Sequence, residues 1–104
     1  MENKDVILEK PDLPKRLFWE FRYEEMNWRE DYVTVIERVI ERGNTKEWTE
    51  MVRFYGEEKI IHALRNEINY LADTAIHDAC TYFRLRKEEL SCYIRKQSRP
   101  RHWH

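Results

Sequence analysis

The sequence predicts an all-α fold, namely a single small domain of four main helices plus one or two short helices, followed by a basic C-terminal tail. Only two glycines and three prolines occur among the 104 residues, so the chain has few places for the sharp turns of a β fold. Apolar residues also recur at intervals of three and four between recognisable helix start and stop signals. We therefore expect a loose N-terminal arm over residues 1–12, the helical domain over residues 13–93 and the basic tail over residues 94–104.

The composition is typical of a small, well-solvated folded protein. Charged residues make up 38% of the chain and aromatic residues 13%, which is unlike a disordered segment. No apolar run approaches the roughly 18 residues of a membrane span, and the N-terminus has no apolar stretch typical of a secretory signal. Two cysteines, Cys80 and Cys92, provide no disulfide framework, so we expect a reduced, cytoplasmic protein.

An aromatic stretch precedes the first main helix. Pro11 and Pro14 bracket Leu13, which makes this part of the chain extended or turned. Apolar side chains then follow at Leu17, Phe18, Trp19, Phe21 and Tyr23. The alternation at the last three is also typical of a short strand, but the sequence offers no partner strand. We therefore expect a helical turn or an irregular strap that packs its aromatic side chains onto the core.

Two helices joined by a tight turn are predicted over residues 27–56. The first has Asn27 as its N-cap, with Glu30 three residues later as in a capping box. Its apolar face follows the helical spacing of Tyr32, Ile36, Val39 and Ile40. We expect Gly43 to end this helix as a C′ residue in the left-handed conformation.

The second helix of this pair begins with another capping box, formed by Asn44 and Glu47, and ends at Gly56. Its apolar stripe consists of Trp48, Met51, Val52 and Tyr55. The short turn makes the two helices antiparallel or steeply angled neighbours. Because a tryptophan side chain buries about 200 Å², we expect Trp48 to lie between the two helices and to face the stripe of the first.

Two further main helices and a short one follow. Residues 57–66 carry an apolar face behind a pair of acidic residues, which suit a helix N-terminus. Residues 73–83 carry a second apolar stripe, which consists of Ile76, Ala79, Cys80 and Phe83. A last short helix is expected over residues 87–93.

The third and fourth helices have about the lengths of a helix-turn-helix motif, with a turn near residues 69–72. A recognition helix should expose basic or amide side chains. The fourth helix instead exposes Asp73, Thr74, His77, Asp78 and Thr81. Because the carboxylates would repel phosphate, we count this face against DNA recognition by the pair.

Four side chains are of the types that bind zinc: His62, His77, Cys80 and Cys92. Their spacing matches no zinc-finger pattern, and Cys80 lies on an apolar stripe, where a buried free cysteine is common. Nothing in the sequence orients Cys80 and His77 as a nucleophile and base. We therefore expect no metal and no cofactor.

The sequence also contains no catalytic motif. Its acidic pairs, Glu24–Glu25, Glu57–Glu58 and Glu88–Glu89, are adjacent residues, and adjacent helical side chains diverge by about 100°. They cannot converge on one substrate as the two carboxylates of a glycosidase do. A glycine-rich phosphate loop and a nucleophile elbow are both missing. We therefore expect the protein not to be an enzyme.

The tail differs in charge from the rest of the chain. Its four basic residues leave 15 basic against 20 acidic residues in the segment 1–93, a net charge of −5. Candidate contacts to nucleic acid or to a partner are Arg95, Lys96, Arg99, Arg101 and Trp103. Aromatic residues among arginines are typical of segments that stack on bases. A disordered, solubilising terminus is the alternative that we favour.

Several short blocks of residues follow one another along the chain, namely Leu17-Phe18-Trp19, Trp28, Val35-Ile36-Glu37-Arg38-Val39, Arg42-Gly43, Trp48, Phe54-Tyr55-Gly56 and Cys92-Tyr93. In this order they resemble a family of small bacterial all-helical proteins of unknown function. The segment Lys87–Leu90 matches a further block, with leucine in place of phenylalanine. The resemblance covers residues 17–93, although the fourth helix matches poorly and the basic tail departs from the pattern.

The resemblance implies an antitoxin-like or regulatory role, because such proteins are often small partners encoded beside nucleotidyltransferase-like toxins. The family has no established catalytic residues to carry over. We therefore expect a non-enzymatic protein-interaction module whose partner is another bacterial protein, such as a toxin-like nucleotidyltransferase. The alternative is a nucleic-acid-binding regulator that uses the helical domain and the basic tail. The sequence leaves the oligomeric state open.

Overall fold

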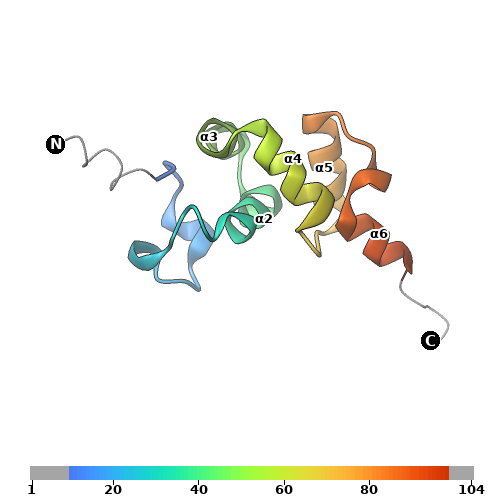
Figure 1. The fold of residues 1–104 in the computed structure, drawn as a ribbon. Coiled ribbons are helices and arrows are strands. Elements are labelled where there is room, and N and C mark those ends of the chain that lie inside the picture. The colour runs from blue at the N-terminus through green and yellow to red at the C-terminus, as the bar shows by residue number, and fades with distance from the viewer. Residues whose placement is uncertain (1–9, 99–104) are drawn as a thin grey trace.

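The computed structural model describes residues 10–98 and confirms the all-α prediction (Figure 1). The described part contains no strand. Its elements in chain order are η1 (Lys15–Phe18), η2 (Tyr23–Glu25), α2 (Tyr32–Arg42), α3 (Thr45–Tyr55), α4 (Glu57–Asn66), α5 (Asp73–Phe83), η3 (Lys87–Glu89) and α6 (Ser91–Ser98). None of these helices is long and apolar enough to cross a membrane.

The α2–α3 pair forms the centre of the fold. The segment that contains η1 and η2 lies on one side of this pair, and η1 packs on α2. On the other side α5 packs against α2, α4 packs against α3, and α6 packs against α4 (Figure 1). Every main helix contributes fully buried apolar side chains to one core, among them Ile36, Met51, Leu64 and Ala79. The α4 and α5 helices therefore pack mainly on other partners, unlike the helices of a DNA-binding helix-turn-helix.

The predicted bounds of α4 and α5 are confirmed, but the last helix is longer than expected. Residues 87–89 form a separate 3₁₀ turn, and α6 begins at Ser91 and continues to Ser98. The Ser91 hydroxyl donates a hydrogen bond of 2.7 Å to the Ile68 carbonyl, which attaches the start of α6 to the segment that follows α4. Residues 94–98 of the predicted tail are thus helical.

The capping box of α3 is confirmed, whereas that predicted for α2 is wrong. The Asn44 and Glu47 side chains each accept a 2.9 Å hydrogen bond from the other residue's backbone N–H. By contrast, α2 begins only at Tyr32. Asn27 caps the preceding turn, where its side chain accepts from the Glu30 N–H at 3.0 Å, and Asp31 rather than Glu30 accepts from the Asn27 N–H.

The turn after α2 does not use the left-handed conformation that we predicted. Gly43 has φ −80° and ψ 157°, which is extended backbone open to any residue. A Cβ atom at this position would lie 2.7 Å from the Val39 carbonyl oxygen and 3.0 Å from Val39 Cγ1. Glycine is required here because the chain turns back against its own last helical turn. Gly56, at the end of α3, does have a positive φ of 90°.

Gly43→Ala is expected to lower the free energy of unfolding by about 1–3 kcal/mol, because the added methyl group overlaps a backbone oxygen. Gly56→Ala should also destabilise, but through its positive φ, since no atom lies within 4 Å of the added Cβ. Because ψ at Gly56 is 144°, its backbone lies outside the left-handed helical region that asparagine tolerates, in a region that is essentially restricted to glycine. Urea unfolding should therefore show that alanine and asparagine both destabilise the fold at Gly56 and at Gly43. Equal stability of Gly43→Ala and the wild type would contradict the close approach.

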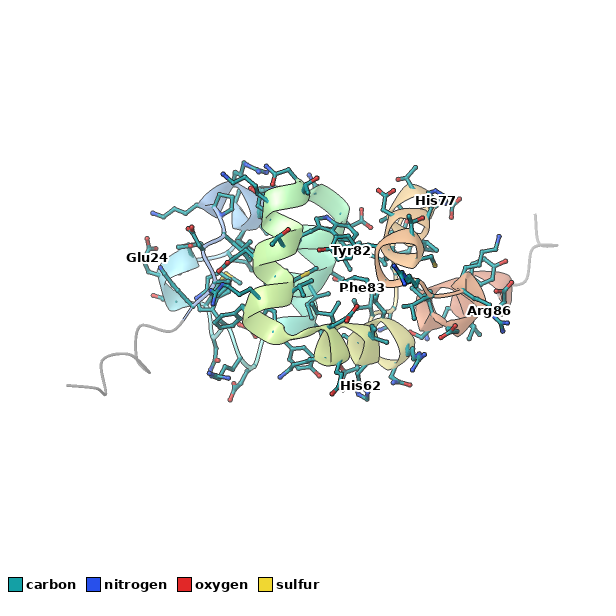
Figure 2. The ribbon with its side chains drawn as sticks, turned by 90° about the horizontal axis from the view of Figure 1, so that it is seen from above. Glu24, His62, His77, Tyr82, Phe83 and Arg86 are labelled. Carbon is teal, nitrogen blue, oxygen red and sulfur yellow. The ribbon has the colours of Figure 1, made fainter. Side chains whose placement is uncertain are left out.

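Trp48 is buried as expected, with 7% of its surface exposed, but its ring neighbours lie on α5 rather than on α2. The centroid of its ring is 5.0 Å from that of Tyr82 and 6.2 Å from that of Phe83. Figure 2 shows Tyr82 and Phe83 on the side of α5 that faces the α2–α3 pair. The Tyr32 hydroxyl instead donates a hydrogen bond to the Glu67 carboxylate. Trp48 therefore joins the hairpin to α5.

Candidate partner-binding surface

The aromatic stretch forms the predicted irregular strap, which runs through η1 and η2. The N–H of Leu17 bonds to the Pro14 carbonyl at 3.2 Å, and that of Phe21 bonds to the Phe18 carbonyl at 2.8 Å. These short turns direct consecutive side chains to opposite sides. Leu17 and Phe18 are buried, whereas Trp19 is 71% exposed and Phe21 is 39% exposed. The expectation that all the aromatic side chains of the strap pack on the core is wrong for these two.

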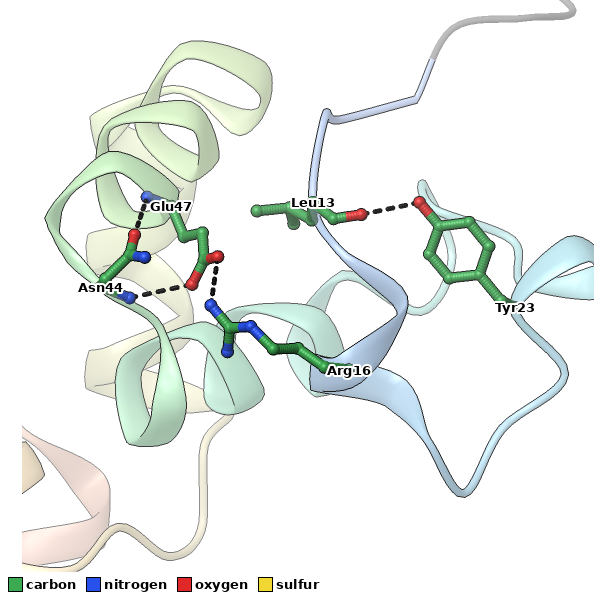
Figure 3. A network of polar contacts seen from close by, with 5 residues as sticks. All are labelled: Leu13, Arg16, Tyr23, Asn44 and Glu47. Atoms are coloured by element: carbon green, nitrogen blue, oxygen red, sulfur yellow. Dashed lines mark hydrogen bonds and ion pairs between the residues drawn. The ribbon is translucent and has the colours of Figure 1, made fainter.

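The inner side of the strap is held by an aromatic cluster. The ring of Phe18 meets that of Trp28 edge to face, with a centroid distance of 5.4 Å, and Tyr23 meets Trp28 in the same way at 5.4 Å. The Tyr23 hydroxyl also donates a 2.7 Å hydrogen bond to the Leu13 carbonyl (Figure 3). These contacts close the strap into a loop.

A polar network attaches the strap to α3. Glu47 is 9% exposed, and its carboxylate both caps α3 and accepts a hydrogen bond from the Arg16 guanidinium (Figure 3). The Asp12 N–H donates a 2.7 Å hydrogen bond to the Glu50 carboxylate, and Pro11 is fully buried. Residues 11 and 12, which we assigned to a loose arm, are therefore held against the domain. Residues 1–9 of the predicted arm lie outside the described residues.

The outer side of the strap presents the two exposed aromatic side chains beside a pocket of about 410 Å³. Arg38 of α2 anchors this side, because its guanidinium makes two hydrogen bonds to Glu20, at 2.8 and 2.6 Å, and a third to the Leu17 carbonyl. The same guanidinium lies 5.2 Å from the centroid of the Phe21 ring. We call Trp19, Phe21 and the charged residues around them the strap surface.

The charged residues of the strap surface form ion pairs with one another. Lys15 pairs with Glu24 at 3.0 Å, Arg22 with Glu25 at 3.6 Å, and Arg38 with Glu20 at 2.6 Å. The hydrogen bond from Arg38 lowers the pKa of Glu20, and that from Lys15 lowers the pKa of Glu24. These carboxylates are therefore ionised at neutral pH, and the three pairs carry no net charge.

A larger open groove, of about 700 Å³, lies between α5 and the C-terminal elements. Ile76, Cys80, Leu85 and Tyr93 supply its apolar lining, and His77 and Lys87 are among its polar residues. Burial, followed by the nearby Glu89 and Glu88, raises the pKa of the Cys80 thiol. The thiol is therefore protonated at neutral pH and is a poor nucleophile.

The residues that we considered as zinc ligands do not form a cluster. Cys92 is fully buried, whereas His62 on α4 and His77 on α5 are exposed and lie apart in Figure 2. Within residues 10–98, no group of three or more histidine, cysteine or acidic side chains is arranged to hold a metal ion.

The tail residues are only partly described. Arg95 is exposed on α6, and the backbone of Lys96 belongs to the same helix. Arg99, Arg101 and Trp103 lie beyond the described residues.

The strap surface was missed in the sequence because an apolar run flanked by ion-paired charges has the same composition whether its rings face the core or solvent.

Comparison with known protein families matches residues 13–64 to a family of unknown function, DUF6922. This segment is half of the chain and contains the strap, α2, α3 and most of α4. The matched segment overlaps residues 17–64 of the resemblance described above. Because the function of the matching family is unknown, the match assigns no function to the chain. Neither the comparison with curated proteins nor that with solved structures gave a match. The chain belongs to this family of unknown function (DUF6922).

Proposed function

We propose that the protein is a non-enzymatic interaction module that binds another bacterial protein through the strap surface, as an antitoxin-like or regulatory partner. The observation that carries this proposal is the exposure of Trp19, the most exposed of the large apolar side chains in the described part of the chain. Tryptophan is enriched among the residues that dominate binding energy at protein interfaces. A side chain of this size that contributes little to the core is a natural anchor for a partner.

The charges of the strap surface favour a protein partner over a nucleic acid. Binding to a polyanion relies on unpaired lysines and arginines that displace counterions from phosphates. Lys15, Arg22 and Arg38 are instead neutralised by acids of the same surface. An aromatic centre with a rim of mixed charge resembles the core and rim of a protein interface.

The strap is also preorganised for binding. A hydrogen bond from Tyr23 to Leu13 closes the strap, and the contacts of Arg16 with Glu47 and of Glu20 with Arg38 attach it to the domain. A partner would therefore meet an ordered backbone, and the entropy lost on association would be smaller than for a flexible segment. Of the acidic pairs, Glu88–Glu89 includes a residue with a structural contact, because Glu89 accepts a 2.7 Å hydrogen bond from Arg65.

The partner that we propose is a nucleotidyltransferase-like toxin in the same cytoplasm, on the basis of the resemblance described above. The experiment is to co-express the chain with the product of the neighbouring gene and to measure the affinity of the purified pair by calorimetry. Trp19→Ala is expected to weaken binding at least tenfold, which corresponds to about 1.4 kcal/mol. Tyr70→Ala, at an exposed aromatic residue outside the strap surface, serves as the matched control.

We expect the control variant to bind within about threefold of the wild type, since most interface-distant surface changes cost little. Unchanged affinity of Trp19→Ala would remove the strap surface from the interface. If the chain forms no stable complex with the neighbouring gene product, nor with any purified protein that accompanies it from its native host, the interaction role itself is wrong.

One observation favours nucleic-acid binding as a second candidate. The basic residues of the tail begin on an ordered helix, because α6 extends to Ser98 and exposes Arg95. If the four tail cations each contact one phosphate, the logarithm of the affinity for duplex DNA should fall with the logarithm of salt concentration at a slope near −3.6. The acidic body should keep this binding weak and insensitive to sequence.

The test compares the wild type with a variant in which Arg95, Lys96, Arg99 and Arg101 are all glutamine. Substitution is preferable to truncation after Tyr93, because truncation would remove more than half of α6. We expect only weak retention on DNA, lost in the variant. Tight, tail-dependent and sequence-selective binding would favour the nucleic-acid role over the protein-interaction role.

A further inference from the structure

Three helices surround an open pocket of about 400 Å³ on a part of the molecule distinct from the strap surface. Glu41 of α2, Trp48 of α3, and Asp78 and Tyr82 of α5 supply its charged and aromatic lining. The described lining contains these two carboxylates and no lysine, arginine or histidine. The pocket is therefore negative, and it brings together residues that are far apart in the sequence.

Two aromatic rings form one wall of the pocket. The centroids of Trp48 and Tyr82 are 5.0 Å apart, and the ring planes are tilted by 49°. Tyr82 is 43% exposed, although it packs on Trp48. Since Trp48 is only 7% exposed, the ring face within reach of a ligand is that of Tyr82, and the faces of tyrosine rings carry partial negative charge and attract cations.

The carboxylates are placed beside this wall by the geometry of the helices. Asp78 and Tyr82 are four residues apart on α5, so they share one helical face. One oxygen of Glu41 accepts a 2.8 Å hydrogen bond from the Ala72 N–H, which orients the carboxylate. The pocket thus combines the exposed ring of Tyr82 with two carboxylates on different helices.

We propose that this pocket receives an arginine side chain of the protein partner, an inference that rests on the proposed function. The guanidinium group is planar, so it can stack on an aromatic face while its edge donates hydrogen bonds to carboxylates. The ammonium group of lysine is a compact charge without a planar face, so it cannot stack on the aromatic ring and bond to the carboxylates at the same time. The pocket would set which partner binds, while the strap surface anchors it.

The first test uses N-acetyl-arginine methylamide as the probe and the full chain as the receptor. The indole N–H signal of Trp48, assigned by comparison with Trp48→Phe, should shift saturably as the probe is added. The citrulline analogue has nearly the same shape and no charge, so it should cause no comparable shift. Added salt should weaken the arginine effect, because exposed charges are screened. Equal shifts with both probes would overturn the proposal.

Substitutions locate the effect in the pocket. Asp78→Asn should weaken probe binding about threefold to fivefold, as expected for the loss of one exposed charge pair. Tyr82→Leu should also weaken it, with thermal unfolding confirming that the variant is folded. Glu58→Gln, at an exposed acid of α4 outside the lining, is the matched control and should bind as the wild type does. Unchanged binding by Asp78→Asn would contradict the assignment.

Two further outcomes separate this inference from the proposed function. If Arg99→Gln/Arg101→Gln shifts the Trp48 signal without any probe, the chain's own C-terminal arginines occupy the pocket and the partner's arginine does not. If the purified partner binds Asp78→Asn as tightly as the wild type but binds Trp19→Ala weakly, the pocket inference fails and the proposed function stands. If Trp19→Ala and Asp78→Asn both weaken the complex, both are supported.

Discussion

Replacing Trp48 with alanine is expected to lower the free energy of unfolding by about 3–5 kcal/mol, the usual cost of removing a buried large aromatic side chain. The indole joins α3 to α5 through the rings of Tyr82 and Phe83, so the substitution leaves a cavity between the hairpin and the C-terminal half. Small domains have a total stability of about 5–15 kcal/mol, so the loss would be a large share of it. Urea unfolding at equilibrium measures this difference.

Trp48→Phe is the control for this experiment, because it keeps an aromatic ring at the same position. Its cost should be clearly smaller than that of alanine, since less of the cavity remains empty. A loss well under about 1 kcal/mol for Trp48→Ala would show that the indole does not support the packing of α5 on the hairpin.

Phe18→Ala is expected to have a similarly large effect, again about 3–5 kcal/mol of unfolding free energy. Phe18 is almost fully buried and meets Trp28 edge to face, so its removal would loosen the strap on the core. The neighbouring Trp19→Ala should change stability by no more than about 0.5 kcal/mol, because its side chain is largely exposed. Parallel unfolding curves of the two variants make the comparison.

The contrast between these adjacent residues also bears on the binding proposal. If Trp19→Ala is as destabilising as Phe18→Ala, the indole supports the fold, and loss of partner binding in that variant could not be assigned to the strap surface. A stable Trp19→Ala variant that binds its partner weakly is the combination that we expect.

Much of the fold could be predicted from the sequence. The bounds of α4 and α5 and the capping box at Asn44 and Glu47 match the expectation. The candidate sites were less predictable. Trp19 was assigned to the core, and the pocket that includes Glu41 and Asp78 was not predicted at all. The apolar spacing of a strap only a few residues long is too brief to reveal which side faces the core.

The sequence by itself determined the helices, their order and most of their ends, because these depend on residues three or four positions apart. The tertiary structure decided which side of the strap is exposed, and it placed Trp48 against the rings of Tyr82 and Phe83 on α5. It also decided that Gly43 is extended and crowded by Val39. Orientation and crowding depend on the path of the backbone and on segments distant in the sequence, which local periodicity and capping signals do not specify.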